Sequence, residues 1–111
     1  MIEKTVLNYL SGQLPVPVYM ERPENPPGRY VIIEKLGGGK RNHIQSATLA
    51  IQSVAESLYQ AALLNETVKT AMESAIICHE ISRVELNSDY NFTNTTTREY
   101  RYQAVYDLTY Y

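Results

Sequence analysis

The chain has 111 residues, of which 44% are hydrophobic and 20% are charged, and this composition is typical of a single soluble globular domain. Its formal net charge of -2 gives no basic excess of the kind that nucleic-acid-binding domains usually show. Cys78 is the only cysteine, which excludes an intramolecular disulfide and is typical of a protein made in a reducing compartment. Glu3, Lys4 and Asn8 interrupt the N-terminal segment, so we expect no signal peptide. No apolar run approaches the roughly 20 residues of a membrane-spanning helix, so we expect no membrane contact.

The N-terminal segment predicts a short helix followed by an extended, proline-rich stretch. Ile2, Val6 and Leu10 lie at four-residue spacing, which predicts one apolar face of a helix over residues 2–10. Gly12 is expected to end this helix, because glycine tolerates a left-handed cap. The prolines of "LPVPVYM" lack amide donors, so that segment predicts an edge strand or extended chain. The "ERPENPPGR" segment predicts a loop.

A β-hairpin is expected next. Residues 29–36 are rich in valine and isoleucine and are apolar on both faces in the middle, which predicts a central strand. Residues 44–54 alternate with a period of two, which predicts a second strand. The glycine-rich stretch between them is interpreted as the loop of the hairpin.

Residues 56–76 carry the strongest helical pattern in the sequence. Apolar residues recur there at three- and four-residue spacing and form one stripe, which consists of Leu58, Ala61, Ala62, Val68, Met72 and Ala75. A helix of about 20 residues is roughly 30 Å long. We therefore expect this helix to cover one face of a sheet.

The C-terminal third predicts two strands joined by a turn. The apolar set is Val84, Leu86, Tyr90 and Phe92 in the first strand, and Tyr100, Tyr102, Ala104, Tyr106, Leu108 and Tyr110 in the second. Each set alternates with mainly polar residues, which is typical of an antiparallel sheet with one face on a core. The "TNTTT" segment between the two strands predicts the turn.

The resulting order, α-β-β-β-α-β-β, predicts an α+β fold. We expect a mixed, mainly antiparallel sheet with one long helix packed on one face and a short N-terminal helix. The sequence has no internal repeat and no low-complexity tail, so residues 1–111 are interpreted as one domain.

The Gly-Gly-Gly-Lys-Arg stretch that ends at Arg41 resembles a phosphate-binding loop only superficially. A P-loop requires G-x-x-x-x-G-K-[S/T] between a strand and a helix. Here the upstream glycine is absent, Arg41 occupies the Ser/Thr position, and the next element is predicted to be a strand. We expect no nucleotide or other cofactor at this point. Two interpretations stay open, a mobile exposed loop and a partner-binding loop that orders on assembly.

The residue types that carry chemistry do not form a recognisable constellation. Cys78 and His79 are neighbours, whose side chains diverge on a helix or a strand, and His43 has no partner at metal-ligand spacing. The carboxylates fall mainly on the polar faces of the last two predicted strands, where arginines are available as cross-strand partners. We therefore expect no catalytic residue, no metal ligand and no cofactor, and a protein that assembles rather than an enzyme.

The aromatic content leaves one alternative function. The chain has ten tyrosines, one phenylalanine and no tryptophan, and tyrosine suits a partly hydrated surface or an interface. A small nucleic-acid-binding module could use Lys35, Lys40, Arg41 and exposed tyrosines. However, no RNP-like motif is present and the C-terminal tyrosines fall on the face assigned to the core. We favour packing and expect no specific nucleic-acid recognition.

Three long stretches resemble the small tail-completion proteins of long-tailed bacteriophages, a group that includes tail-terminator and head–tail joining proteins. The stretches are "VPVYMERPENPPGRYVIIEKLGGG", "LAIQSVAESLYQAALLNETVKTAM" and "ISRVELNSDYNFTNTTTREYRYQAVYDLTYY". They cover a proline-rich loop with a strand and a glycine-rich break, a strand that leads into the long helix, and a terminal hairpin that ends in aromatic residues. The resemblance spans nearly the whole chain.

This resemblance implies a sheet covered by helices and a homo-oligomeric ring, usually a hexamer, at the head-proximal end of a phage tail. The implied partners are the phage tail tube protein and the head connector protein, and the implied location is the virion, after synthesis in the host bacterial cytoplasm. Whether the ring terminates the tail or joins it to the head stays open. The positions expected to act as assembly loops are Gly37, Gly38, Gly39, Lys40 and Arg41, with Thr93, Asn94, Thr95, Thr96 and Thr97 as a second loop.

Overall fold

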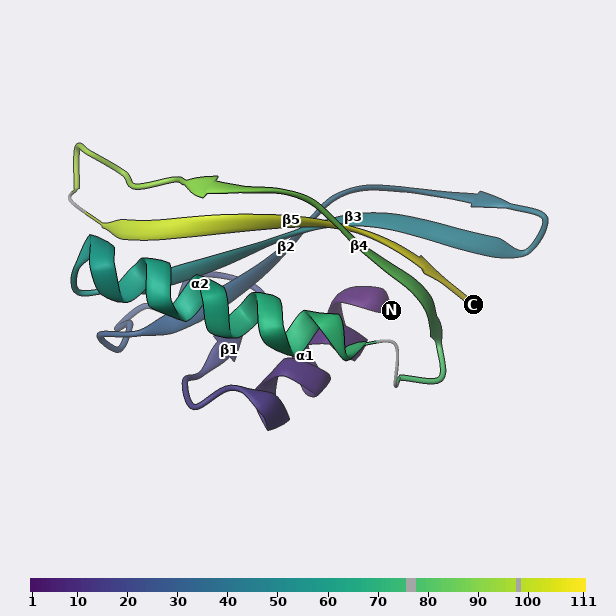
Figure 1. The fold of residues 1–111 in the computed structure, drawn as a ribbon, viewed down its shortest axis with the longest axis horizontal. Coiled ribbons are helices and arrows are strands. Elements are labelled where there is room, and N and C mark those ends of the chain that lie inside the picture. The colour runs from purple at the N-terminus through teal and green to yellow at the C-terminus, as the bar shows by residue number, and fades with distance from the viewer. Residues whose placement is uncertain (76–77, 98) are drawn as a thin grey trace.

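The computed structural model describes residues 1–75, 78–97 and 99–111, and within them the chain forms two helices and one five-stranded sheet (Figure 1). The elements are α1 (Ile2–Gln13), β1 (Val18–Tyr19), β2 (Tyr30–Arg41), β3 (Ile44–Ala55), α2 (Leu58–Glu73), β4 (Ile81–Asn91) and β5 (Tyr100–Tyr110). The predicted α+β class and the predicted element order are confirmed. Over the described residues, neither helix combines the length and the apolar composition that crossing a membrane requires.

The strands lie in the order β1-β2-β3-β5-β4. β1 is parallel to β2, and the other three pairings are antiparallel. β5 therefore inserts between β3 and β4, which makes β4 one edge of the sheet. The two-residue β1 forms the opposite edge, as its prolines predict.

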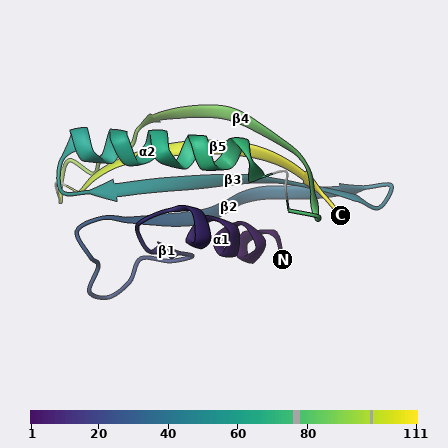
Figure 2. The same cartoon turned by 60° about the horizontal axis from the view of Figure 1, so that its bottom comes forward.

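Both helices pack on the same face of the sheet (Figures 1 and 2). α2 lies over β3 and β5 and reaches β4, whereas α1 lies over β1 and β2 and touches α2. The core between the layers is formed by one buried cluster, which includes Val6, Leu10, Ile33, Leu49, Ile51, Val68, Met72, Tyr106 and Leu108. We call the opposite side of the sheet the open face.

α1 extends further than its sequence predicts. Its buried residues are the expected Ile2, Val6 and Leu10, but the helix continues to Gln13, so that Gly12 lies inside its last turn and does not end it. The chain leaves the helix at Leu14, which is extended and precedes Pro15. A residue before proline is sterically disfavoured in the helical region, so the proline and not the glycine sets this end.

α2 begins after Ser57, whose side chain accepts a hydrogen bond from the Gln60 amide at 3.2 Å. Its buried face includes the predicted Ala61, Val68 and Met72, and also Leu64 and Asn65, which the predicted stripe omits. Of the other predicted members, Ala75 is buried just after the helix, Leu58 is exposed and Ala62 is half-buried. Ile76, the predicted end of the helix, lies outside the described residues.

The β2–β3 hairpin turns at Asn42 and His43, which both have positive φ (50° and 67°). Two central residues of positive φ match the twist of adjacent antiparallel strands, and asparagine is among the residues that adopt this conformation most readily. The prediction that Gly37, Gly38, Gly39, Lys40 and Arg41 form a loop is therefore wrong. These residues continue β2 after a bulge at Leu36 and pair with the first part of β3.

A second bulge, at Asn87, changes the faces of β4. Leu86 pairs with Tyr106 on the helix face, whereas Tyr90, beyond the bulge, pairs with Gln103 on the open face. One extra residue reverses the side of every residue that follows it. The prediction that Val84, Leu86, Tyr90 and Phe92 share one core-facing side is therefore wrong, and Leu86, Tyr90 and Phe92 are exposed.

The packing of α2 can be tested with two adjacent leucines. Leu64→Ala removes a side chain that is 7% exposed and should lower the free energy of unfolding by about 2–5 kcal/mol. Leu63→Ala, at a position that is 45% exposed, should change it by less than about 0.5 kcal/mol. Urea denaturation followed by circular dichroism measures both values. Equal losses in the two variants would contradict the docked face of α2.

Candidate assembly surfaces

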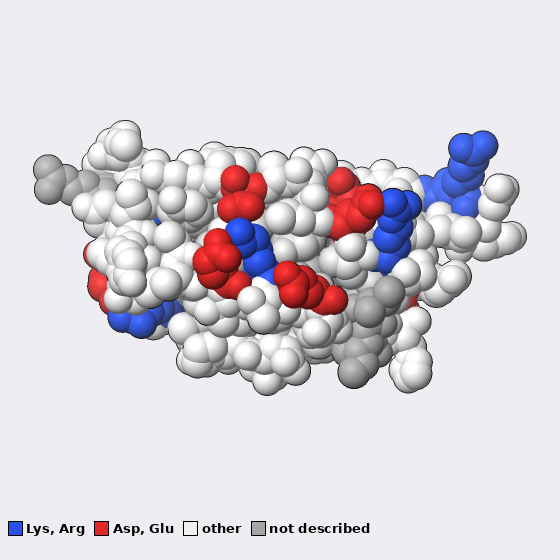
Figure 3. Space-filling view, in the orientation of Figure 1, with Lys and Arg blue, Asp and Glu red and all other residues white. Residues whose placement is uncertain are grey.

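The end of the β2–β3 hairpin projects beyond both helices, and we call residues 36–46 the arm (Figures 1 and 2). Most of its side chains are exposed, including the apolar Leu36 and Ile44, which are 53% and 45% accessible. Lys40 and Arg41 lie beside the turn, and lysine and arginine side chains stand at this end of the molecule in Figure 3. The arm is therefore a cationic strand pair with no helix over it.

Of the three glycines in the arm, Gly38 is the one that lies tightly against its surroundings. A Cβ atom at Gly38 would lie 3.0 Å from the Ser46 carbonyl oxygen and 2.9 Å from the Lys35 side chain. Gly37 and Gly39 flank a shallow hollow of about 320 Å³ that also includes Thr48. A side chain at residue 38 would press on the Ser46 carbonyl, whereas the other two glycines leave a strip of bare backbone on the surface.

Two strand edges are unpaired within the described part of the chain. β1 pairs with β2 only at Val31 and Ile32, so the outer edge of β2 from Glu34 onward has no neighbouring strand there. β4 is the other edge, along its whole length from Ile81 to Asn91. Exposed edges of this kind can add a strand from another chain.

The open face carries cross-strand hydrogen bonds that sequence reasoning missed. Thr48 Oγ1 and Asn87 Nδ2 donate to the two oxygens of Asp107, at 2.8 and 2.9 Å. The bonds from Asn87 and Thr48 lower the pKa of Asp107, because they stabilise its charged form. In a second row, Gln52 donates to Gln103 at 3.0 Å, and Gln103 donates to the Tyr90 hydroxyl at 2.5 Å. Strand register is thus held by polar pairs on this face.

The predicted second loop, residues 93–97, does connect β4 to β5 as a turn. Asn94 Oδ1 accepts the backbone N–H groups of Thr96 and Thr97, at 3.1 and 3.4 Å, so the turn is closed by its own side chain. Next to it, Arg101 lies 4.8 Å from the centre of the Phe92 ring. The conformation is as predicted, and the role of Thr93, Asn94, Thr95, Thr96 and Thr97 in assembly stays a prediction.

A groove runs between α2 and β4 on the helix side of the molecule. It encloses about 250 Å³ and is lined by Met72, Val84, Leu86, Tyr106, Glu66, Lys69, Thr70 and Glu73. We call it the acidic groove, because acidic side chains gather over α2 and β4 in Figure 3. Burial first, and then the charges of Glu73, Asp89 and Glu66, raise the pKa of the Tyr106 hydroxyl to about 12. These three carboxylates disfavour the charged form of the hydroxyl.

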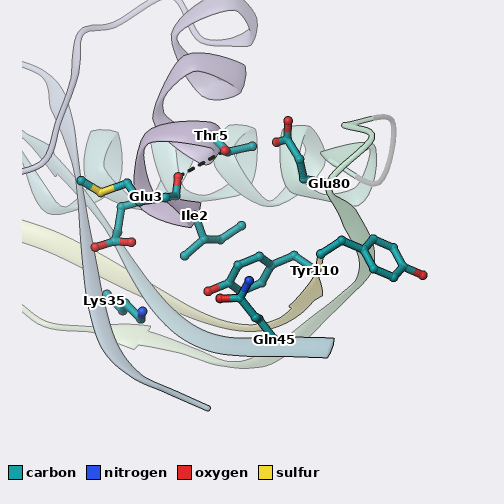
Figure 4. A pocket seen from close by; sticks show the side chains of 9 residues that line it. Ile2, Glu3, Thr5, Lys35, Gln45, Glu80 and Tyr110 are labelled. Carbon is teal, nitrogen blue, oxygen red and sulfur yellow. Dashed lines mark hydrogen bonds between the residues drawn. The ribbon is translucent and has the colours of Figure 1, made fainter. Parts of the chain in front are cut away.

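A larger hollow of about 540 Å³ lies where α1 begins, beside Lys35, Gln45 and Tyr110 (Figure 4). Its two carboxylates, Glu3 and Glu80, belong to α1 and to the turn before β4. Among the described residues that line this hollow there is no cysteine, serine or histidine. The arrangement offers charged contacts to a partner and no nucleophile–base pair of those types.

The two histidines and the cysteine do not lie together. His43 lies in the turn of the arm, and Cys78 and His79 lie between α2 and β4. Burial raises the pKa of the half-buried Cys78 thiol, with a further contribution from Glu80, and this keeps the thiol in its less reactive form. No three His, Cys, Asp or Glu residues cluster as metal ligands within residues 1–75, 78–97 and 99–111.

Comparison of the sequence with protein-family models and with curated proteins finds no match. The surfaces described above must therefore be interpreted from their own residues.

The Asp107 network makes a prediction about acid sensitivity. Thr48→Val removes one of its donors and should raise the pKa of Asp107 towards the ordinary value, as measured by NMR titration of the carboxyl carbon. The pKa of Asp107 is lower in the folded protein than in the unfolded chain, so the charged carboxylate stabilises the fold at any pH above its unfolded pKa. This stabilisation is lost as the pH falls below about 4 and the carboxylate becomes protonated. Thr109→Val is the control, and an unchanged pKa in Thr48→Val would contradict the network.

Proposed function

We propose that this chain is a structural virion protein that forms a ring at the head-proximal end of a phage tail, caps the tail tube and joins it to the head connector. The specific biological setting comes from the sequence resemblance to tail-completion proteins. The surfaces of the structure support the more general part of the proposal, which is that copies of the chain assemble with one another and with a neighbouring protein.

The arm is the observation that carries the proposal. It exposes two large apolar side chains, Leu36 and Ile44, together with the cationic Lys40 and Arg41, and it has an unpaired strand edge. The hydrogen-bonding groups of such an edge and the apolar side chains gain stability when another chain covers them. A projection of this composition fits docking better than it fits catalysis.

The two unpaired edges also bear on the symmetry of an assembly. The outer edge of β2 and the outer edge of β4 are opposite edges of the sheet, and they carry different residues. A contact that joins one to the other is heterologous, and repetition of a heterologous contact gives a closed ring when the rotation between copies closes. The hexamer implied by the resemblance is one such ring.

Assembly can be measured directly. Sedimentation velocity of the purified protein, alone and after addition of tail tubes, should reveal rings or tube-bound copies, and negative-stain microscopy should place them at one end of the tube. A chain that stays monomeric at all concentrations and does not associate with tubes would overturn the proposal.

The role of the cationic tip can be tested in the same assay. The double variant Lys40→Ala/Arg41→Ala should assemble poorly while its unfolding midpoint stays close to wild type, since exposed substitutions usually cost under about 0.5 kcal/mol. The control Lys4→Ala/Arg29→Ala removes two positive charges from exposed positions outside the arm. Equal assembly of the two double variants would remove the arm from the proposal.

The alternative function, binding of nucleic acid, is favoured by one observation. Tyr90 and Phe92 are exposed on the open face, and Arg101 lies over the Phe92 ring. Such aromatic groups can stack on the bases of a single strand, and binding would be sensitive to salt. Fluorescence anisotropy of a labelled single strand at low salt distinguishes the two functions. Nucleic-acid binding predicts that the anisotropy rises when the protein is added, whereas the ring proposal predicts no binding of the strand through Tyr90 or Phe92.

A further inference from the structure

The proposed ring requires a contact between copies, and two surfaces of the structure complement each other in charge. Resting on that proposed function, we propose that Lys40 and Arg41 at the tip of the arm dock into the acidic groove between α2 and β4 of a neighbouring copy. The occupant of the groove is thus a second copy of this chain.

The groove has the lining that a long cationic side chain needs. Its apolar part is formed by Met72, Val84, Leu86 and Tyr106, and its carboxylates are Glu66 and Glu73. Lysine and arginine bury their aliphatic stems against apolar surface and keep the charged group at a polar rim. Leu86 is 46% exposed, so part of this apolar surface is still open to solvent in a single copy.

Charges within one copy leave the groove negative. Lys69 Nζ lies 2.8 Å from Glu66 and 3.4 Å from Asp89, so it is shared between two carboxylates. Arg83 pairs with Glu85 on β4, and Glu73 forms no ion pair with any residue that the structure describes. A basic tip would therefore meet unbalanced negative charge.

The arm cannot fill the groove of its own chain. Its tip is held in the sheet by the β2–β3 ladder, which continues to the Arg41–Ile44 pair beside the turn. β3 and β5 also separate β2 from β4 in the sheet order. Figures 1 and 3 show the tip at one end of the molecule and the acidic side chains nearer its middle. Contact between the two surfaces therefore requires two copies.

The contact joins different surfaces of identical chains, which makes it heterologous. Each copy has one arm and one acidic groove, so each can engage one neighbour on either side. The competing occupant is a basic segment of the tail tube protein, and the test must separate that occupant from a second copy.

Charge reversal followed by mixing of the variants distinguishes a second copy from a segment of the tail tube protein as the occupant of the groove. The arm variant is Lys40→Glu/Arg41→Glu, and the groove variant is Glu66→Lys/Glu73→Lys, which changes two exposed carboxylates of α2. Alone, each variant places like charges in the contact, and its self-association should weaken by more than about tenfold. In an equal mixture every contact between different variants again pairs opposite charges. Assembly should then recover, with the two variants alternating around rings of even number.

The controls make each failure distinguishable. Glu21→Lys/Glu24→Lys reverses two exposed carboxylates in the loop after β1 and should assemble like wild type, and thermal unfolding of each variant verifies its fold. Because the fourfold variant Lys40→Glu/Arg41→Glu/Glu66→Lys/Glu73→Lys restores complementarity within one sequence, it should also assemble. If wild type assembles but mixing and the fourfold variant restore nothing, the arm–groove contact is wrong and the ring stands. If wild type neither self-associates nor binds tubes, the proposed function fails as well.

Discussion

The structure depends on the burial of one face of the sheet beneath two helices. Leu49 and Ile51 on β3 and Tyr106 and Leu108 on β5 point towards Val68 and Met72 of α2 or towards α1, and together they exclude water from a single core. The helices cover only part of the sheet, and the strands extend beyond the covered part. The surplus length forms the arm, and the uncovered face and the β4 edge follow from the same arrangement.

Local periodicity explains why much of the fold could be predicted. The alternation along β3 and β5 and the three- and four-residue spacing along α2 are properties of neighbouring residues, so the sequence alone indicates them. The predictions are wrong where a single residue changes the backbone conformation that the pattern of its neighbours indicates. Pro15 moves the end of α1 beyond Gly12, and the bulge at Asn87 turns Tyr90 away from the core. A bulge has no periodic signature, so the pattern of the strand conceals it.

The candidate surfaces were predictable only in part. Composition alone singles out Lys40 and Arg41, although the turn lies at Asn42 and His43 and the glycines continue a strand. The acidic groove has no signature in the sequence, because Glu73 and Leu86 meet only when α2 packs across the sheet beside β4. The Thr48–Asp107 hydrogen bond also depends on strand register, which propensity does not specify.

The shortness of β1 has a consequence for the free protein. β1 covers only the near half of β2, where the Pro17 carbonyl accepts a hydrogen bond from the Val31 amide at 3.0 Å and the proline has no amide to donate in return. Within the part of the chain that the structure describes, the far half of β2 keeps free hydrogen-bonding groups on its outer edge, and Lys35, Lys40 and Arg41 on that half place positive charges where two identical edges would meet. Like charges oppose the pairing of two such edges with each other, so the composition of β2 disfavours association between identical edges.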